Sequence, residues 1–384
     1  MNRKDHRMSL ASLHPERDEE CTPDIFMVAG VGNSCVVLTG EGIVVIDTPL
    51  RNASRVLESI RARSTLPIHT IIYTHNHADH AWTTGIFLDD AQKNGYPRPR
   101  VIAHEMVTRQ FELDKKLSSY YRYINRIQFG QGFIRPAGYE EYVTERIIRP
   151  DVTYSDSLQF RLGNLTFELY HYMGETDDGT WVWIPERKTA VAGDLAEGFC
   201  PNIGNPLKAQ RYELEWAEAL ETIAGKNPDY LIPGHGPVLR AEQVKEVCLG
   251  TASFLRSLHD QVIALLNEGC WIEEILERVR VPPEFTGKPW LAPVYGHPTF
   301  IIHGIHRRYA GWFNGNPGEL FPSGKSQVAA EVVKLSGAAH LIERLKELQH
   351  QGNIQLALHL ADFVIGGSED MTRRKEALLE MVKN

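Results

Sequence analysis

Short runs of apolar, mostly β-branched residues alternate with turn residues over the first part of the chain. Gly and Asn separate the first three runs, and a stretch with apolar side chains at helical spacing precedes the fourth. This pattern predicts strands joined by tight turns or by crossover helices. The predicted strands are residues 25–28, 34–38, 42–47, 68–73 and 100–104, and the predicted helices are residues 51–63 and one beginning near Ala81.

A second series of strands follows in the middle of the chain. Residues 158–162 and 165–170 each alternate apolar and polar positions, and Gly163-Asn164 between them is typical of a hairpin turn. Further apolar runs at 181–185, 189–194 and 229–233 predict three more strands. Beyond residue 240 the apolar positions recur at helical spacing. The predicted helices there are residues 241–267, 271–280, 325–349, 353–364 and 369–382.

This order of elements predicts an α/β domain followed by a helical one. We expect a flexible arm over residues 1–22, the α/β domain over 23–245 and the helical domain over 246–384. Residues 105–150 form an insertion rich in aromatic and basic side chains. The insertion is either a lid that supplies cations and rings to an anionic, partly apolar substrate, or a solvated helix with an aromatic packing face.

Composition and charge narrow the class of protein. The 384 residues are 42% hydrophobic and 23% charged, as in ordinary soluble globular proteins. A net charge of −8 argues against a nucleic-acid partner, because the phosphate backbone is itself negative. The five cysteines show no C-x-x-C spacing, and the polar N-terminus lacks an apolar signal segment. No stretch approaches the roughly 20 apolar residues of a membrane span. We therefore expect a soluble cytoplasmic protein.

The segment from Thr74 to His80 carries the strongest chemical pattern. It follows an apolar strand, and His75, His77, Asp79 and His80 fall within six residues. Side chains at this spacing converge only from a loop, and loops at the ends of strands commonly hold chemistry in α/β proteins. Imidazole and carboxylate together suit zinc and related divalent metals. The alternative is a polar turn that is merely rich in histidine.

Other strand ends supply possible partners for this segment. Glu175, Asp194 and His235 each follow an apolar strand and have a glycine close by. Asp47 ends an earlier strand, where it either braces the metal loop or serves as a turn residue. His171, four residues before Glu175, is an alternative ligand.

The pattern His75-x-His77-x-Asp79-His80 resembles that of the metallo-β-lactamase fold superfamily. This resemblance implies a four-layer αβ/βα sandwich with a one- or two-metal site at the sheet edge, and a bracing role for Asp47. Glu175 stands where most of the superfamily has a third histidine, which resembles the alkyl sulfatases. Carried over from that family, the ligands of one zinc are His75, His77 and Glu175. Those of a second zinc are Asp79, His80, Asp194 and His235, with Asp194 as a possible bridge and Asp79 also orienting the attacking water.

The C-terminal part extends this resemblance. Residues 309–317, Tyr-Ala-Gly-Trp-Phe-Asn-Gly-Asn-Pro, resemble the dimerisation domain of alkyl sulfatases, which implies a homodimer. The family reads sulfate partly through an Asn, which Asn202 matches. In the family an Arg follows this Asn, and its place in this sequence is Leu207-Lys208. Lys208 could supply the positive charge there, but it lacks the planar guanidinium that binds an anion with two parallel hydrogen bonds. The family's histidine before the Gly-Trp pair aligns with Phe300, and His303 is the nearby substitute.

The sequence thus predicts a binuclear zinc hydrolase that cleaves a small anionic ester, most simply an alkyl sulfate, with zinc-activated water. Hydrolysis of a phosphodiester, lactone or thioester by the same metals is the first alternative. A non-catalytic interaction protein that keeps the fold is the second. Because that protein would usually have lost ligands, seven competent side chains at the expected positions argue against it.

Overall fold

The computed structural model describes residues 18–50, 52–129 and 147–367. The predicted helix at 369–382, most of the predicted arm and residues 130–146 of the insertion lie outside this part. The chain divides into two compact units, Met1–Ala310 and Gly311–Asn384. The boundary between the two compact units therefore lies after Ala310. The domain boundary near residue 245 stays a prediction.

The first unit contains a seven-stranded sheet in which the strands follow chain order. The strands linked by tight turns pair antiparallel, and those linked by crossover helices pair parallel, from β4 through β7. The strands are β1 (Glu19–Thr22), β2 (Ile25–Val28), β3 (Ser34–Leu38), β4 (Ile43–Ile46), β5 (Ile68–Ile72), β6 (Arg100–His104) and β7 (Val152–Tyr154). Strand β1 falls within the expected arm. It pairs with β2 at the edge of the sheet, and Cys21 is its one buried residue, so the polar sequence gives little sign of a strand.

The second sheet has six strands in the order β13-β12-β11-β10-β9-β8. The predicted hairpin is present, with Leu162 opposite Leu165 and Gly163 in the left-handed region at φ 58°. Strands β11 and β12 are parallel, and β9 runs in the same direction because β10 is antiparallel to both of its neighbours. The strands are β8 (Ser157–Leu162), β9 (Leu165–Tyr172), β10 (Gly179–Ile184), β11 (Thr189–Gly193), β12 (Tyr230–Pro233) and β13 (Leu239–Arg240).

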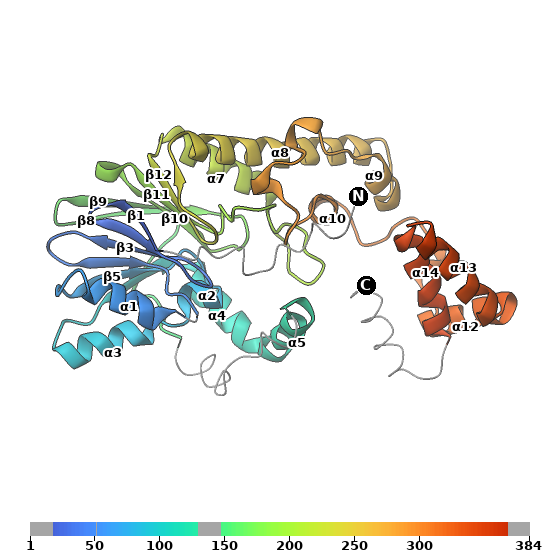
Figure 1. The fold of residues 1–384 in the computed structure, drawn as a ribbon, viewed down its shortest axis with the longest axis horizontal. Helices are drawn as coiled ribbons and strands as arrows, with labels where there is room; N and C mark the ends of the chain where they lie inside the picture. The colour runs from blue at the N-terminus through green and yellow to red at the C-terminus, as the bar shows by residue number, and fades with distance from the viewer. Residues whose placement is uncertain (1–17, 51, 130–146, 368–384) are drawn as a thin grey trace. The chain divides into compact units, whose positions relative to one another are not determined.

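Helices cover the outer face of each sheet (Figure 1). The helices α1 (Ala53–Arg61), α3 (Gly85–Asn94) and α4 (Met106–Lys116) lie on the first sheet, and α7 (Glu213–Gly225) and α8 (Glu242–Asn267) on the second. Three buried clusters fill the three interlayer spaces. Val56, Ile60 and Phe87 belong to the first, Ile46, Phe167 and Val182 to the one between the sheets, and Trp181, Trp216 and Phe254 to the third. The expected four-layer αβ/βα sandwich is confirmed.

Two further helices, α9 (Ile272–Arg278) and α10 (Pro298–Tyr309), complete the first unit. Ile275 and Ile301 lie in the same buried cluster as the α7 and α8 residues. Gly204 shows how closely α10 meets the loop after β11. A side chain there would fall 1.6 Å from the carbonyl oxygen of Phe300, so this position requires glycine. The loop that contains Asn202 is therefore fixed against α10.

The second unit consists of four helices in its described part: α11 (Pro317–Leu320), α12 (Lys325–Ser336), α13 (Ala338–His350) and α14 (Ile354–Gly366). Residues 325–349, predicted as one helical stretch, form two helices because Gly337 adopts a left-handed φ of 78° between them. Helix α14 packs against both α12 and α13. Trp312, Phe321 and Leu335 are largely exposed. No helix of the described residues has both the length and the apolar character needed to cross a membrane. The cytoplasmic location stays a prediction.

Candidate metal centre

The predicted ligands converge at one edge, where strands of both sheets end. The segment after β5 carries His75 and His77, and the short helix α2 (Ala78–Ala81) carries Asp79 and His80. On the second sheet, β9, β11 and β12 run in one direction and end at the same edge. The residues that follow these three strands include Glu175, Asp194 and His235.

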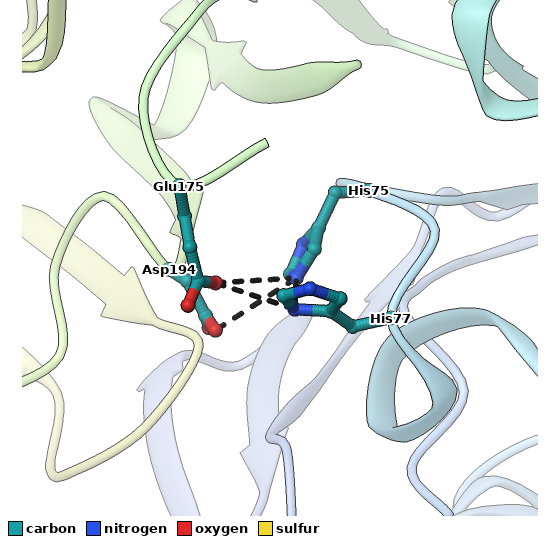
Figure 2. A group of neighbouring side chains, drawn as sticks. All are labelled: His75, His77, Glu175 and Asp194. Atoms are coloured by element: carbon teal, nitrogen blue, oxygen red, sulfur yellow. Dashed lines mark hydrogen bonds and ion pairs between the residues drawn. The ribbon is translucent and has the colours of Figure 1, made fainter. Parts of the chain in front are cut away.

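His75, His77, Glu175 and Asp194 form a first group, whose possible ligand atoms all lie within 4.8 Å of one another. Figure 2 shows the four side chains pointing toward a common space. The Nε2 atom of His75 lies 2.9 Å from Nδ1 of His77, and that Nδ1 lies 3.3 Å from Oε2 of Glu175. The Nε2 atom of His75 is also 3.7 Å from Oδ2 of Asp194. These four atoms could hold one cation.

Asp79, His80 and His235 form a second group, again within 4.8 Å. The Oδ2 atom of Asp79 lies 3.5 Å from Nε2 of His235 and 3.8 Å from Nε2 of His80. The other oxygen of Asp194, Oδ1, lies 3.3 Å from Nε2 of His80 and 3.5 Å from Nε2 of His235. Asp194 thus turns one carboxylate oxygen toward each group.

The donor set fits a metal pair. Three buried atoms in the two groups have no hydrogen-bond partner among the described residues: Oε2 of Glu175, Nε2 of His80 and Oδ1 of Asp194. Buried polar atoms are normally satisfied, because desolvating them without a partner costs free energy. Bound cations would satisfy all three, and imidazole with carboxylate is a zinc-competent set.

The charges of His75 and Asp194 agree with their use as ligands, whereas the neighbouring carboxylates raise the pKa values of His77, His80 and His235 against the effect of burial. Burial, with help from neighbouring His80 and His77, lowers the pKa of His75 well below its ordinary value. The ring is therefore neutral, as a metal ligand must be. Burial alone would raise the pKa of Asp194, but His80 and His235 hold it well below its ordinary value. Asp194 is therefore an anion that can face two cations.

Asp47 holds this arrangement from behind. Its carboxylate accepts hydrogen bonds from the backbone N–H and the hydroxyl of Thr74, both at 2.7 Å, and from Nδ1 of His80 at 2.8 Å. Since Nδ1 of His80 is engaged, its Nε2 is left for a metal. Asp47 adopts a left-handed φ of 65°, which Asp tolerates better than most side chains. These contacts are the ones a brace of the metal loop would make, and that role of Asp47 stays a prediction.

Arg211 is a residue of the site that the sequence analysis missed. Its NH1 group forms an ion pair with Oε1 of Glu175 and donates to the backbone oxygen of Asn202 at 2.7 Å. It is only 3% exposed. No periodicity marks this position, because Arg211 lies in an irregular segment just before α7. The one available signal was a basic residue close behind Asn202 in the sequence.

The predicted substrate-binding residues Asn202 and Lys208 lie near the metal groups. Asn202 is fully buried, and its Oδ1 accepts a hydrogen bond from Asn205 at 3.0 Å. The Nζ of Lys208 donates to Oδ1 of Asn125 at 3.0 Å. Burial lowers the pKa of Lys208 to about 8, with Arg211 contributing, while Glu175 and Asp79 pull in the opposite direction.

The structure does not bring His303 or His171 into either group. His303 lies on the exposed side of α10, and burial lowers its pKa, with Glu273 and Arg307 as the nearby charges. His171 donates from Nδ1 to the oxygen of Gly179 at 3.0 Å. Its ring stacks on that of His104, with centroids 3.7 Å apart. His171 therefore behaves as a structural histidine.

The described part of the insertion forms α4 and α5 (Ser118–Phe129). Tyr120, Tyr123 and Ile127 on α5 are more than half exposed, so these three side chains are not packed against the described structure, and the choice between a lid and a solvated helix stays open. On another side of the helix, Asn125 contacts Lys208. This contact joins the insertion to the site, as a lid would require.

Comparison with known proteins agrees with this geometry. Residues 27–235 match the family model of the metallo-beta-lactamase superfamily, and residues 271–384 match that of the alkyl sulfatase dimerisation domain. A linear primary-alkylsulfatase of Pseudomonas sp. (strain ATCC 19151) is 26% identical over 349 residues, which cover 86% of this chain and 66% of that protein. An (R)-specific secondary-alkylsulfatase of Pseudomonas sp. is 23% identical, covering 90% and 56%.

Solved structures show the same fold. A double mutant of the sec-alkyl sulfatase PisA1 superposes with a TM-score of 0.82 at 20% identity, over 95% of this chain and 62% of that one. The chain spans about two thirds or less of the length of these relatives. The superfamily model alone covers more than half of the 384 residues. The chain therefore belongs to the metallo-beta-lactamase superfamily.

Proposed function

We propose that this chain is a binuclear zinc-dependent hydrolase of alkyl sulfate esters. The observation that carries the proposal is the orientation of Asp194, whose two oxygens face two separate groups of donors. The similarity to alkylsulfatases over more than four fifths of the chain supports the substrate class.

In this proposal His75, His77 and Glu175 hold one zinc ion. Asp79, His80 and His235 hold the other, and Asp194 bridges them. The chemistry supplied by two bound zinc ions is a lowered pKa of water and neutralisation of an anionic ester. His80 and the loop around Thr74 are kept in position by Asp47.

Asp79 has a second role. Its side chain is about a quarter exposed, whereas His75, His80 and Asp194 are almost fully buried. One of its oxygens faces His80 and His235, and its partial exposure leaves the side chain within reach of the attacking water. Asp79 is therefore our candidate for orienting the nucleophile.

Asn202 and Lys208 are the candidates for binding the anionic head of the substrate. Lys208 uses one of its three N–H donors on Asn125, so two remain for an anion. Its ammonium is largely protonated at neutral pH, since its pKa is about 8. His303 could join this set only by reaching from the exposed side of α10.

The proposed assembly is a homodimer. Residues 271–384 match the dimerisation model, and the second unit exposes Trp312, Phe321 and Leu335. Large exposed apolar side chains of this kind commonly mark interfaces. Light scattering at micromolar concentration should give the mass of two chains, and Leu335→Asp should shift it toward one. A monomer for the unaltered protein would contradict this part of the proposal.

The deciding experiment is sulfate release from a medium-chain alkyl sulfate by the zinc-loaded protein. Asp79→Ala should abolish turnover, while Asp89→Ala, an exposed carboxylate on α3, should not change it. In ¹⁸O-labelled water, label in the alcohol means attack at carbon, and label in the sulfate means attack at sulfur. No turnover with two zinc ions bound per chain would contradict the sulfatase assignment.

A phosphodiester, lactone or thioester is the alternative substrate. Lys208 is the observation that favours it, because a lysine binds an anion as a point charge and lacks the planar fork of an arginine. A panel of these esters with the same zinc-loaded protein separates the alternatives. A non-catalytic role fits poorly, since all seven predicted ligands come together.

A further inference from the structure

Glu175 uses its two carboxylate oxygens differently. Oε2 faces the first metal group, 3.3 Å from Nδ1 of His77 and 3.6 Å from Nε2 of His75. Oε1 faces away from these rings and is paired with Arg211. Oε2 has no hydrogen-bond partner in the described structure, which leaves it for a cation. One oxygen of the carboxylate therefore faces the metal group, and the other faces the guanidinium of Arg211.

The backbone fixes Arg211 in this position. The N–H of Tyr212 donates to the oxygen of Gly174 at 3.0 Å, so the residues before α7 lie alongside the residue that precedes Glu175. The same guanidinium nitrogen also donates to the backbone oxygen of Asn202. With 3% exposure, Arg211 has little freedom to turn away. The contact with Glu175 is part of the fold rather than a mobile surface pair.

The charges make this pair unusual among the ligands. A histidine, which most of the superfamily has at this position, is a neutral ligand, whereas Glu175 is anionic. A buried cation directly behind the carboxylate offsets that charge, and at low dielectric such a pair interacts strongly. Glu197, a second carboxyl that is almost fully buried, also lies within electrostatic range of both Glu175 and Arg211. Removing the arginine would leave Glu175 without the buried cation that is paired with its Oε1.

We propose that Arg211 is a positioning residue that keeps Glu175 a one-oxygen ligand and offsets its charge. The Glu175–Arg211 pair then acts as a neutral oxygen donor in place of the usual histidine. This inference rests on the metal centre of the proposed function and is independent of the substrate.

Cobalt substitution tests the inference without any measurement of activity. The visible absorption of protein-bound Co²⁺ weakens as its coordination number rises. With Arg211→Gln, Oε1 of Glu175 becomes free to bind as well, so we expect a loss of absorption per bound cobalt at unchanged cobalt content. Arg211→Lys keeps a cation at this position, so its absorption per bound cobalt should lie between that of the unaltered protein and that of Arg211→Gln. Arg256→Gln removes a surface ion pair with Glu221 and is the matched control, with no expected change.

A second background separates this role from simple support of the fold. Glu175→His supplies a neutral ligand without a second oxygen, and it leaves Arg211 without its carboxylate. Adding Arg211→Gln to Glu175→His should therefore leave the cobalt spectrum unchanged and strengthen cobalt binding. If Arg211 only supported the backbone at Asn202, the glutamine would be equally harmful in both backgrounds.

Two results overturn the inference: a normal spectrum for Arg211→Gln with full cobalt content, or equal damage by Arg211→Gln in both backgrounds. If Arg211→Gln alone does not fold, the cobalt spectra of Arg211→Lys and of the double variant Glu175→His/Arg211→Gln still test the inference. Failure of the unaltered protein to bind cobalt at all would overturn the metal centre itself, and with it this inference. Cobalt binding without sulfate-ester turnover would overturn only the proposed substrate.

Discussion

The metal side and the substrate side of the candidate site are supported in different ways. On the metal side, two ligands are contacted from behind by buried partners of opposite charge type: Arg211 lies behind Glu175, and Asp47 lies behind His80. On the substrate side, Lys208 is held by the neutral amide of Asn125 on the insertion helix α5. The comparison suggests a preformed metal centre beside a more adaptable anion site.

The difference has a physical basis. Buried ionic contacts are strongly coupled to the fold, because loss of one partner leaves the other charge desolvated. A single hydrogen bond between a lysine and an amide contributes only about 1 kcal/mol. Variants on the metal side should therefore have large effects on metal content and stability. Variants on the substrate side should change substrate affinity while the metal remains bound.

The largest effect is expected for Asp194→Ala, because this residue faces both groups. We expect the variant to lose most of the zinc of both groups on dialysis, and turnover to fall by more than the roughly 100-fold typical of outer-shell variants. Metal analysis of the dialysed protein measures this directly. Retention of one full zinc per chain would show that the two groups are independent and that Asp194 does not bridge them.

Asp47 variants should have the next largest effect. Asp47→Ala leaves the N–H of Thr74 and Nδ1 of His80 without their acceptor, which should weaken zinc binding about 10–100-fold. The free energy of unfolding should fall by about 1–3 kcal/mol. Chelator competition and chemical denaturation measure the two quantities.

Asp47→Asn is the matched control for the backbone. Asn also tolerates the left-handed φ of 65° and keeps an acceptor oxygen. We expect it to retain most of the stability and only part of the zinc affinity. Equal losses in Asp47→Asn and Asp47→Ala would mean that the charge of Asp47 accounts for the whole effect and that its hydrogen-bond geometry does not contribute.

The features that could be predicted are those marked by the spacing of residues along the chain or by the ends of apolar runs. His75 to His80 are close together along the chain, and Glu175, Asp194 and His235 follow apolar strands, so their positions made them candidates and the resemblance to alkyl sulfatases grouped them into a ligand set. The hairpin turn at Gly163 was also predicted from the sequence, and the structure contains it.

Arg211 was missed because its importance comes from burial beside Glu175, and neither periodicity nor spacing in the sequence indicates that contact. Strand β1 was missed because a polar edge strand resembles a loop. His303 was predicted from an approximate alignment, and the structure shows it exposed on α10 and outside both metal groups, so its role in substrate binding stays a prediction.

Lys208→Gln tests the substrate side. Removal of the ammonium should raise KM for an anionic ester about tenfold, the effect of losing roughly 1.4 kcal/mol, with zinc content unchanged. Since burial lowers the pKa of Lys208 to about 8, the charge is present below that pH and lost above it. KM of the unaltered protein should therefore rise as the pH increases through about 8.

Lys208→Gln should remove this rise, because glutamine does not titrate. Lys226→Gln, a change at a lysine paired with Glu168, serves as the control and should keep the original pH profile. An unchanged KM in Lys208→Gln would exclude Lys208 from substrate binding, and the anion would then have to be read by Asn202 and the metals alone.

Asn125→Ala should have the smallest effect and addresses the insertion most directly. The variant removes one neutral hydrogen bond to Lys208, so KM should rise only a few-fold, consistent with about 1 kcal/mol. Combined with Lys208→Gln, it should add nothing further if the two residues act as one unit. An additional increase in KM in the double variant would mean that α5 contacts the substrate by itself, and the insertion would then be a second binding element rather than a support for Lys208.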